Sequence, residues 1–292
     1  MSNPVFNRSP VFRTSSTTVY EAPYNPELAS NGHGVAWAVD RGDSVMGPSG
    51  ADVRAMVNPQ VLRPPAERGP MTYDDVLIKS VGMLAVLLVG ATVGWLFVPM
   101  YPILFYLGAG VGLVTYLINT FRREPSPVMI TVYAAAEGLF VGGVSVIFEA
   151  RWSGIVLQAV IATIIVFATT LMLFASGKVR ASNKMARIVG VAAWSYLFYA
   201  GVNIVLVLTG VVRQPFGLDS LKVAGIPLGV IVGVVMIVVA ACFLILSFDM
   251  IKRGVEQCAP ARYAWTAAFG LLVDLVYLYL QILRVLAILR NN

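Results

Sequence analysis

Seven long apolar runs follow one another from about Val76 to the C-terminal end of the chain, and they limit the possible folds more than any other feature. Each run approaches the roughly 20 residues that a helix needs to span a bilayer. Only 12% of the residues are charged, whereas soluble domains carry about 25%. The sequence therefore predicts an all-α integral membrane protein with a bundle of seven transmembrane helices. We place the spans at Val76–Val98, Ile103–Phe121, Pro127–Phe148, Ile155–Ser176, Met185–Val211, Ile226–Met250 and Tyr263–Leu289.

The composition divides the chain into two parts. Residues 1–70 are rich in Pro, Ser, Asn, Gly and Arg and show no sustained apolar period. Such a segment cannot bury enough surface to offset its ordering entropy, and it lacks the apolar core of a cleaved signal peptide. We therefore expect residues 1–70 to be a disordered polar cytoplasmic tail and residues 71–292 to be the transmembrane domain. A short motif in the tail that contacts a partner or lipid headgroups is the alternative.

Basic residues lie in the loops between the spans rather than in one patch, so the net charge of +6 does not indicate a nucleic-acid partner. Loops on the cytoplasmic side of a membrane carry an excess of Lys and Arg. The asymmetry predicts a multi-pass protein in the lipid bilayer of the cell membrane, with a cytoplasmic N-terminus and a C-terminus outside. One side has Arg63, Arg68, Arg122, Arg123, Lys178, Arg180, Lys184, Arg187, Lys252, Arg253 and Arg262; the other has Arg151, Arg213, Lys222, Arg284 and Arg290.

The sequence contains no pattern typical of a cofactor site. His33 is the only histidine, and the two cysteines, Cys242 and Cys258, form neither a metal-binding spacing nor a disulfide framework. A Gly-rich phosphate loop is also missing from the sequence. An intramembrane aspartyl protease would use two membrane aspartates, but Asp249 and Asp274 do not stand in a Gly-x-Gly-Asp motif. We therefore expect no cofactor and no enzymatic activity.

Three carboxylates, Glu137, Asp249 and Asp274, fall within the predicted spans. An Asp at the centre of a membrane helix costs about 2.5–3.5 kcal/mol on insertion scales, and such residues mark functional sites. Pro260 interrupts helical structure between the last two spans. Residues at equal depth on either side of that turn should have numbers that sum to about 518–524. Asp249 and Asp274 meet this condition, so we expect them to face each other, with Glu137 in the same depth band.

Two carboxylates held close in a low dielectric cannot both ionise cheaply, so the pair tends to share a proton. When both are ionised, their oxygens suit calcium. Asp249 and Asp274 are therefore predicted to form a proton and calcium sensor, and Glu137 is a candidate carboxylate on the ion route. In the alternative, each acid only hydrogen-bonds a neighbouring helix, for example through Tyr133, Asn203 or Gln281. Arg284 is expected to anchor the external membrane interface.

Glycines recur at a spacing of four residues, which lets helix backbones approach closely in a membrane. We interpret them as packing positions within one bundle, with a homodimer face as the alternative. The series are Gly90 and Gly94; Gly108 and Gly112; Gly138 and Gly142; and Gly225, Gly229 and Gly233.

Three stretches carry a resemblance to a known family: "AAAEGLFVGGVSVIFE" around Glu137, "LILSFDMIKRG" around Asp249 and "AAFGLLVDLVYLYLQILRVL" around Asp274. Together they resemble the Bax inhibitor-1 family (transmembrane Bax inhibitor motif), and the long polar tail looks like that of actinobacterial members. The resemblance implies a bacterial inner membrane protein in which six helices surround the last one. It also implies a pH-sensitive calcium leak whose sensor is an aspartate pair, here Asp249 and Asp274.

This sequence departs from the family pattern at one point. In some members an arginine within the second helix latches the sensor, whereas the second span here has no arginine before Arg122. Other relatives modulate a membrane protease. Two functions therefore stay open: a pH-sensitive leak for calcium or other cations, gated by protons, and a non-conducting regulator of a membrane protease or another integral membrane partner.

Overall fold

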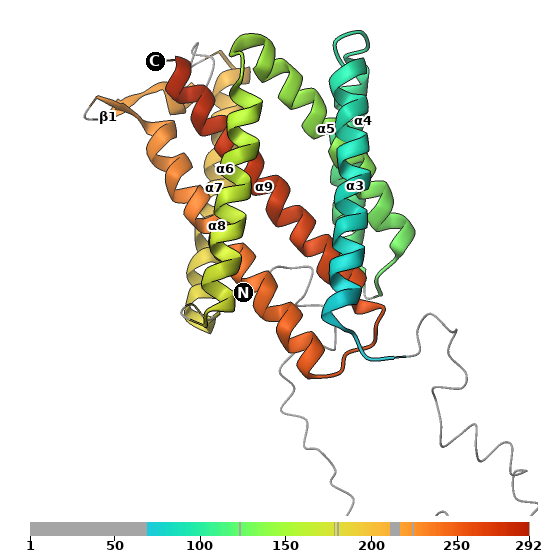
Figure 1. The fold of residues 1–292 in the computed structure, drawn as a ribbon. Helices are drawn as coiled ribbons and strands as arrows, with labels where there is room; N and C mark the ends of the chain where they lie inside the picture. Colours follow the sequence, from blue (N-terminus) through green and yellow to red (C-terminus); the bar gives the residue numbers. More distant parts are fainter. Residues whose placement is uncertain are drawn as a thin grey trace, which may run out of the picture. The chain divides into compact units, whose positions relative to one another are not determined.

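The computed structural model describes residues 69–291, apart from positions 123, 178, 180, 211–216 and 224. The predicted tail thus lies outside the described residues except for Gly69 and Pro70. The described part is a bundle of long helices with a small cap between two of them (Figure 1). Its elements are α3 (Tyr73–Phe97), α4 (Ile103–Phe121), α5 (Pro127–Arg151), α6 (Ile155–Ala175), α7 (Asn183–Leu208), η3 (Gly217–Ser220), β1 (Lys222–Val223), β2 (Ile226–Pro227), α8 (Leu228–Glu256) and α9 (Tyr263–Asn291).

Seven helices in the described part of the chain are long and apolar enough to cross a membrane, as predicted. The bounds of α4 coincide with the predicted span Ile103–Phe121. The largest difference concerns α8, which begins two residues later than predicted and continues past Met250 to Glu256. It begins later because Ile226 and Pro227 pair with β1. It ends later because Lys252 and Arg253 are good helix formers, and apolar content does not mark where such a helix stops.

Helix α9 is the central helix of the bundle, as the prediction of a central C-terminal helix requires. It packs against α3, α5, α6 and α8. In its most apolar stretch 61% of the residues are buried, against 6% in α7. The surrounding helices keep many large apolar side chains exposed on their outer faces. A protein in water could not tolerate this distribution, whereas lipid tails solvate such faces well.

The glycines at spacing four allow α3 and α5 to pack with their backbones in contact. A Cβ atom added to Gly138 would lie 2.2 Å from the carbonyl oxygen of Leu87, and one added to Gly142 would lie 2.0 Å from that of Ala91. Added Cβ atoms on Gly90 and Gly94 of α3 would meet α5 carbonyl oxygens in the same way. These glycines therefore form an α3–α5 glycine seam within one chain.

The start of the described chain is tied to the turn between α8 and α9. The amide of Met71 donates to the carbonyl of Ala259 (2.6 Å), and the amide of Ala261 donates to that of Gly69 (3.2 Å). Helix α3 then starts with a capping box, in which the Thr72 hydroxyl accepts from the Asp75 amide (3.1 Å). We call the end of the bundle where α3 begins the N-terminal end, and the end where α9 finishes the C-terminal end.

A small cap connects α7 to α8 at the C-terminal end. The 3-10 helix η3 is followed by the short antiparallel pair β1 and β2, in which Lys222 pairs with Pro227. Gly225 lies in the turn of this hairpin with φ +84°, and a Cβ atom on it would have no neighbour within 4 Å. Gly225 is therefore a turn residue rather than a packing position. Gly229, by contrast, faces η3, because a Cβ atom there would lie 2.5 Å from that of Asp219.

Candidate functional site

Asp274 lies in the middle of α9 and is 5% exposed. Its carboxylate accepts a hydrogen bond from the hydroxyl of Ser247 on α8. Within the described part of the chain, no lysine or arginine forms an ion pair with it. Asp274 is therefore a carboxyl group placed deep in the central helix with a hydroxyl, rather than a positive charge, as its hydrogen-bonding partner.

Asp249 lies near the C-terminus of α8, close to the turn that leads to α9, and its hydrogen-bonding partner differs from that of Asp274. Its carboxylate forms an ion pair with Arg253 one turn later (2.5 Å), and its side chain is 17% exposed. An (i, i+4) pair of this kind stabilises a helix by about 0.3–0.5 kcal/mol. Asp249 therefore has a counter-charge on its own helix, which Asp274 lacks.

The structure differs from the expected contact between Asp249 and Asp274. The residue of α8 that contacts Asp274 is Ser247, two positions before Asp249. Counting from the turn gave the level of this contact to within two residues. It did not give the face, because two positions on an α-helix differ by about 200°. Proton sharing between Asp249 and Asp274 stays a prediction.

Glu137 lies on α5, where it is half-buried and next to α4. A Cβ atom on Gly112 of α4 would lie 2.9 Å from Glu137 Oε2, so the missing side chain of Gly112 makes room for the carboxylate. One turn before Glu137, Tyr133 packs edge-on against Phe269 of α9, with ring centroids 5.0 Å apart. The helix that carries Glu137 therefore also contacts the part of α9 that precedes Asp274.

The carboxylates do not form a preformed metal site. In the stretches that the structure describes, no group of three or more His, Cys, Asp or Glu side chains is arranged to hold a metal ion. Carboxylate oxygens still suit calcium chemically.

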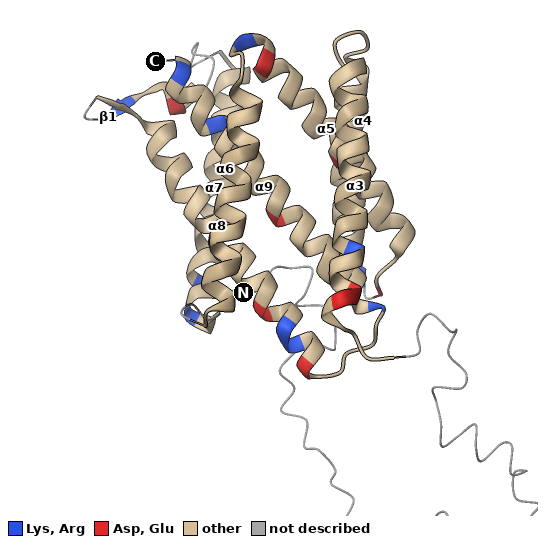
Figure 2. Ribbon diagram, viewed as in Figure 1, with Lys and Arg blue, Asp and Glu red and all other residues tan. Residues whose placement is uncertain are grey.

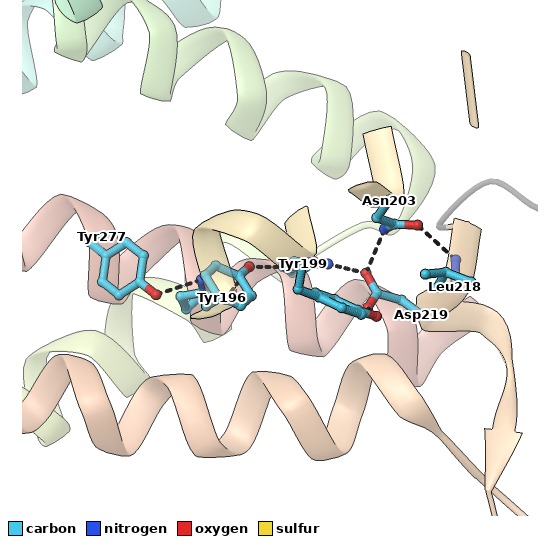
Figure 3. A network of polar contacts seen from close by, with 8 residues as sticks. Tyr196, Tyr199, Asn203, Leu218, Asp219 and Tyr277 are labelled. Atoms are coloured by element: carbon cyan, nitrogen blue, oxygen red, sulfur yellow. Dashed lines mark hydrogen bonds and ion pairs between the residues drawn. The ribbon is translucent and has the colours of Figure 1, made fainter. Parts of the chain in front are cut away.

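A second polar site, absent from the sequence prediction, lies around Asp219 at the C-terminal end. Asp219 belongs to η3 and is 1% exposed. Its carboxylate accepts from Tyr199 Oη (2.7 Å) and Asn203 Nδ2 (3.5 Å), and it forms an ion pair with Arg284 of α9 (Figure 3). The amide of Leu218 donates to Asn203 Oδ1 (2.8 Å), which fixes the start of η3.

Arg284 holds this site to the central helix. Besides Asp219, its guanidinium donates to the hydroxyl of Tyr196 on α7. The guanidinium carbon also lies 5.6 Å from the centroid of the Tyr196 ring. Lys and Arg lie mainly toward the two ends of the bundle (Figure 2), and Arg284 was expected to be an interface anchor of that kind. It instead points to a buried acid, and removing one partner of such a buried pair typically costs about 3–5 kcal/mol.

Comparison with protein families supports the resemblance. The family model described as "Bax inhibitor 1 like" matches residues 3–291, which is nearly the whole chain and includes most of the predicted tail. The chain therefore belongs to this family of membrane proteins. A search of curated proteins gave no match.

Proposed function

We propose that this member of the Bax inhibitor 1 like family is a pH-sensitive leak for calcium and related cations, gated by protonation of Asp274 together with Asp249. The observation that carries the proposal is the place of Asp274, buried in the central helix with Ser247 as its hydrogen-bond donor. A charge at such a depth is costly unless it is compensated. A gain or loss of a proton at Asp274 therefore changes the packing energy of the central helix, which contacts α3, α5, α6 and α8.

The proposal assigns separate roles to the three carboxylates. Asp274 is the buried group whose charge alters the packing of α9 against α8. Asp249 is the second carboxylate of the last helical hairpin, and it forms an ion pair with Arg253 on its own helix. Glu137 is a carboxylate on the route between α4 and α5. Low pH favours the leaking state, because protonation removes the negative carboxylate charge that holds a cation or a nearby basic group.

We further propose that the protein lies in the cell membrane with its N-terminus in the cytoplasm. Counted along the sequence, eleven basic residues flank the span ends assigned to the cytoplasm, against five on the opposite side, and this asymmetry supports the orientation. Calcium would then move along its gradient between the outside and the cytoplasm.

Calcium flux into proteoliposomes of the purified protein, measured at several pH values, tests the proposal. Asp274→Asn should remove most of the pH dependence, and Asp249→Asn should do nearly the same. The double variant should add little, because both changes act on one coupled unit. Asp74→Asn is the matched control, since Asp74 is an exposed acid in the first turn of α3. Asp274→Asn and Asp249→Asn variants that fold and keep the wild-type pH profile would refute the proposal.

The alternative function, a non-conducting regulator of a membrane protease or another integral partner, draws on one observation. Among the described elements, helix α7 packs mainly against α8 and the cap and reaches α9 through Tyr196, and it exposes Trp194 and Phe198. Lipid and a partner helix would both cover such a face. Absence of calcium flux from the wild-type protein at every pH would favour the regulator.

A further inference from the structure

Four polar residues of α9 lie on one face of the helix between its middle and the C-terminal end. They are Asp274, Tyr277, Gln281 and Arg284, separated by three, four and three positions. This spacing keeps side chains on one side of an α-helix and extends over about 15 Å. We call these four residues the polar stripe.

Hydrogen bonds connect the upper three members of the polar stripe through α7. Gln281 Nε2 donates to Tyr277 Oη (3.1 Å), and Tyr196 Oη donates to Gln281 Oε1 (3.4 Å). Arg284 in turn donates to Tyr196 Oη. Figure 3 shows this network from Tyr277 to Asp219. The space between α9 and α7 therefore contains a continuous series of polar groups that begins one turn beyond Asp274.

The Arg284–Asp219 ion pair closes the stripe at the C-terminal end. Asp219 is buried, and its side chain lies against Gly229 of α8, where a larger residue would push η3 away. Tyr199 and Asn203 hold the same carboxylate from α7. The ion pair thus fastens the cap to α7, α8 and α9 at once, over the end of the polar stripe.

We infer that the polar stripe is the C-terminal half of the ion route and that the Arg284–Asp219 pair is its gate. The inference rests on the proposed leak and adds a second closing point, separate from Asp274. The carboxylate of Asp274 and the side-chain carbonyl of Gln281 are hard oxygen ligands of the kind that calcium accepts, and the hydroxyls of Tyr277 and Tyr196 add polar oxygen atoms beside them. Charged residues within membrane helices line ion pathways or pair with each other. In the closed state Arg284 is paired with Asp219. When the Asp219 carboxylate is removed, the unpaired positive charge of Arg284 repels cations.

Thiol labelling tests the gate without relying on conduction. Gln281→Cys, in a background with Cys242→Ala and Cys258→Ala, places a buried probe within the polar stripe. A membrane-impermeant, positively charged thiol reagent is applied from the side of the C-terminal end. That side is identified by the reaction of Leu221→Cys, because Leu221 is exposed next to β1. The probe should react slowly in the parent protein and rapidly when Arg284→Gln or Asp219→Asn is added.

The size of the change can be bounded. Minor states of two-state proteins are typically populated at about 0.1–10%, so full opening should raise the labelling rate by about tenfold or more. Leu278→Cys is the matched control, because Leu278 is fully buried on α9 but outside the polar stripe. Its labelling should stay slow in every variant. If Arg284→Gln also speeds the labelling of Leu278→Cys, that variant has unfolded. The gate is then tested with Tyr199→Phe, which removes only the hydroxyl that donates to Asp219.

Tyr199→Phe should raise the labelling of Gln281→Cys, and an unchanged rate would overturn the gate. Calcium flux separates the gate from the leak itself. Arg284→Gln should increase flux more than Asp219→Asn, because only Asp219→Asn leaves the positive charge of Arg284 at the mouth of the route. If the protein conducts calcium but the labelling rate of Gln281→Cys is unchanged in the gate variants, the gate is refuted and the leak is not. No flux in any variant would refute the leak, and equal flux in Arg284→Gln and Asp219→Asn would refute the charge-selection role of Arg284.

Discussion

Replacing Gly142 with alanine should destabilise the bundle, because the new methyl group would lie 2.0 Å from the carbonyl oxygen of Ala91. An ordinary van der Waals contact begins at 3.4 Å, so α3 and α5 would have to separate by about 1.4 Å at this point. A gap of about 0.5–1 Å already removes a quarter to a half of the dispersion energy of the facing atoms. Overpacking of this kind typically costs about 1–3 kcal/mol.

Gly82 supplies the matched control for this substitution. It lies on α3, and a Cβ atom on it would have no neighbour within 4 Å. Alanine is a better helix former than glycine by about 0.8–1.0 kcal/mol, so Gly82→Ala should be neutral or stabilising. The two Gly→Ala changes are therefore chemically identical and are expected to differ in sign.

Thermal unfolding of the purified protein in detergent measures the difference. For chains of 150–250 residues, about 1 kcal/mol corresponds to a shift in Tm of about 2–4 °C. Relative to Gly82→Ala, which shares the gain in helix propensity, Gly142→Ala should thus lower Tm by about 2–12 °C. Gly138→Ala should behave alike, because its methyl group would lie 2.2 Å from the Leu87 carbonyl oxygen. A Gly142→Ala protein that unfolds at or above the temperature of Gly82→Ala would disprove the close backbone contact between α3 and α5.

Three further predictions concern topology, the ion route and the cap. A cysteine at the exposed Leu221 should react with an impermeant reagent from outside the cell and one at Ser182 should not; the reverse result would invert the proposed orientation. Glu137→Gln should reduce calcium flux without lowering the unfolding temperature, and normal flux would leave Glu137 with a structural role only. Gly217→Ala should loosen the cap and raise the labelling of Gln281→Cys, because Gly217 has φ +59° and an added Cβ atom would meet Asn203 Oδ1; unchanged labelling would show that the cap tolerates the strain.

The apolar pattern of the sequence was sufficient to predict the spans, whereas the central position of the last helix was implied by the family resemblance. The spans follow from uninterrupted apolar length, which the membrane requires directly. The glycine spacing also predicted helix packing, and the structure confirms it for Gly138 and Gly142. It failed at Gly225, because the glycine pattern does not distinguish a hairpin turn from the helix that follows it.

The polar contacts were harder to predict, for two physical reasons. A depth count does not specify the rotation of a helix, so it selected Asp249 where Ser247 makes the contact with Asp274. Asp219 was not considered because it lies between the predicted spans. A carboxylate that is surrounded by water in a loop has no desolvation cost and therefore gives no signal of a functional site. The spacing from Asp274 to Arg284 was the available signal, since it places an arginine on the same face as a buried acid and raises the question of its partner.

The central position of α9 also has a consequence for the order in which the protein is made. The chain emerges from the ribosome with α3 to α8 first, and at about 5–20 residues per second the 29 residues of α9 follow within about 1.5–6 s. The α3–α5 pair can therefore assemble before α9 exists, while the site that α9 will fill must stay open until synthesis ends. Asp274 is translated after Ser247, so its hydrogen-bond donor is already present in the nascent chain when the carboxylate enters the membrane.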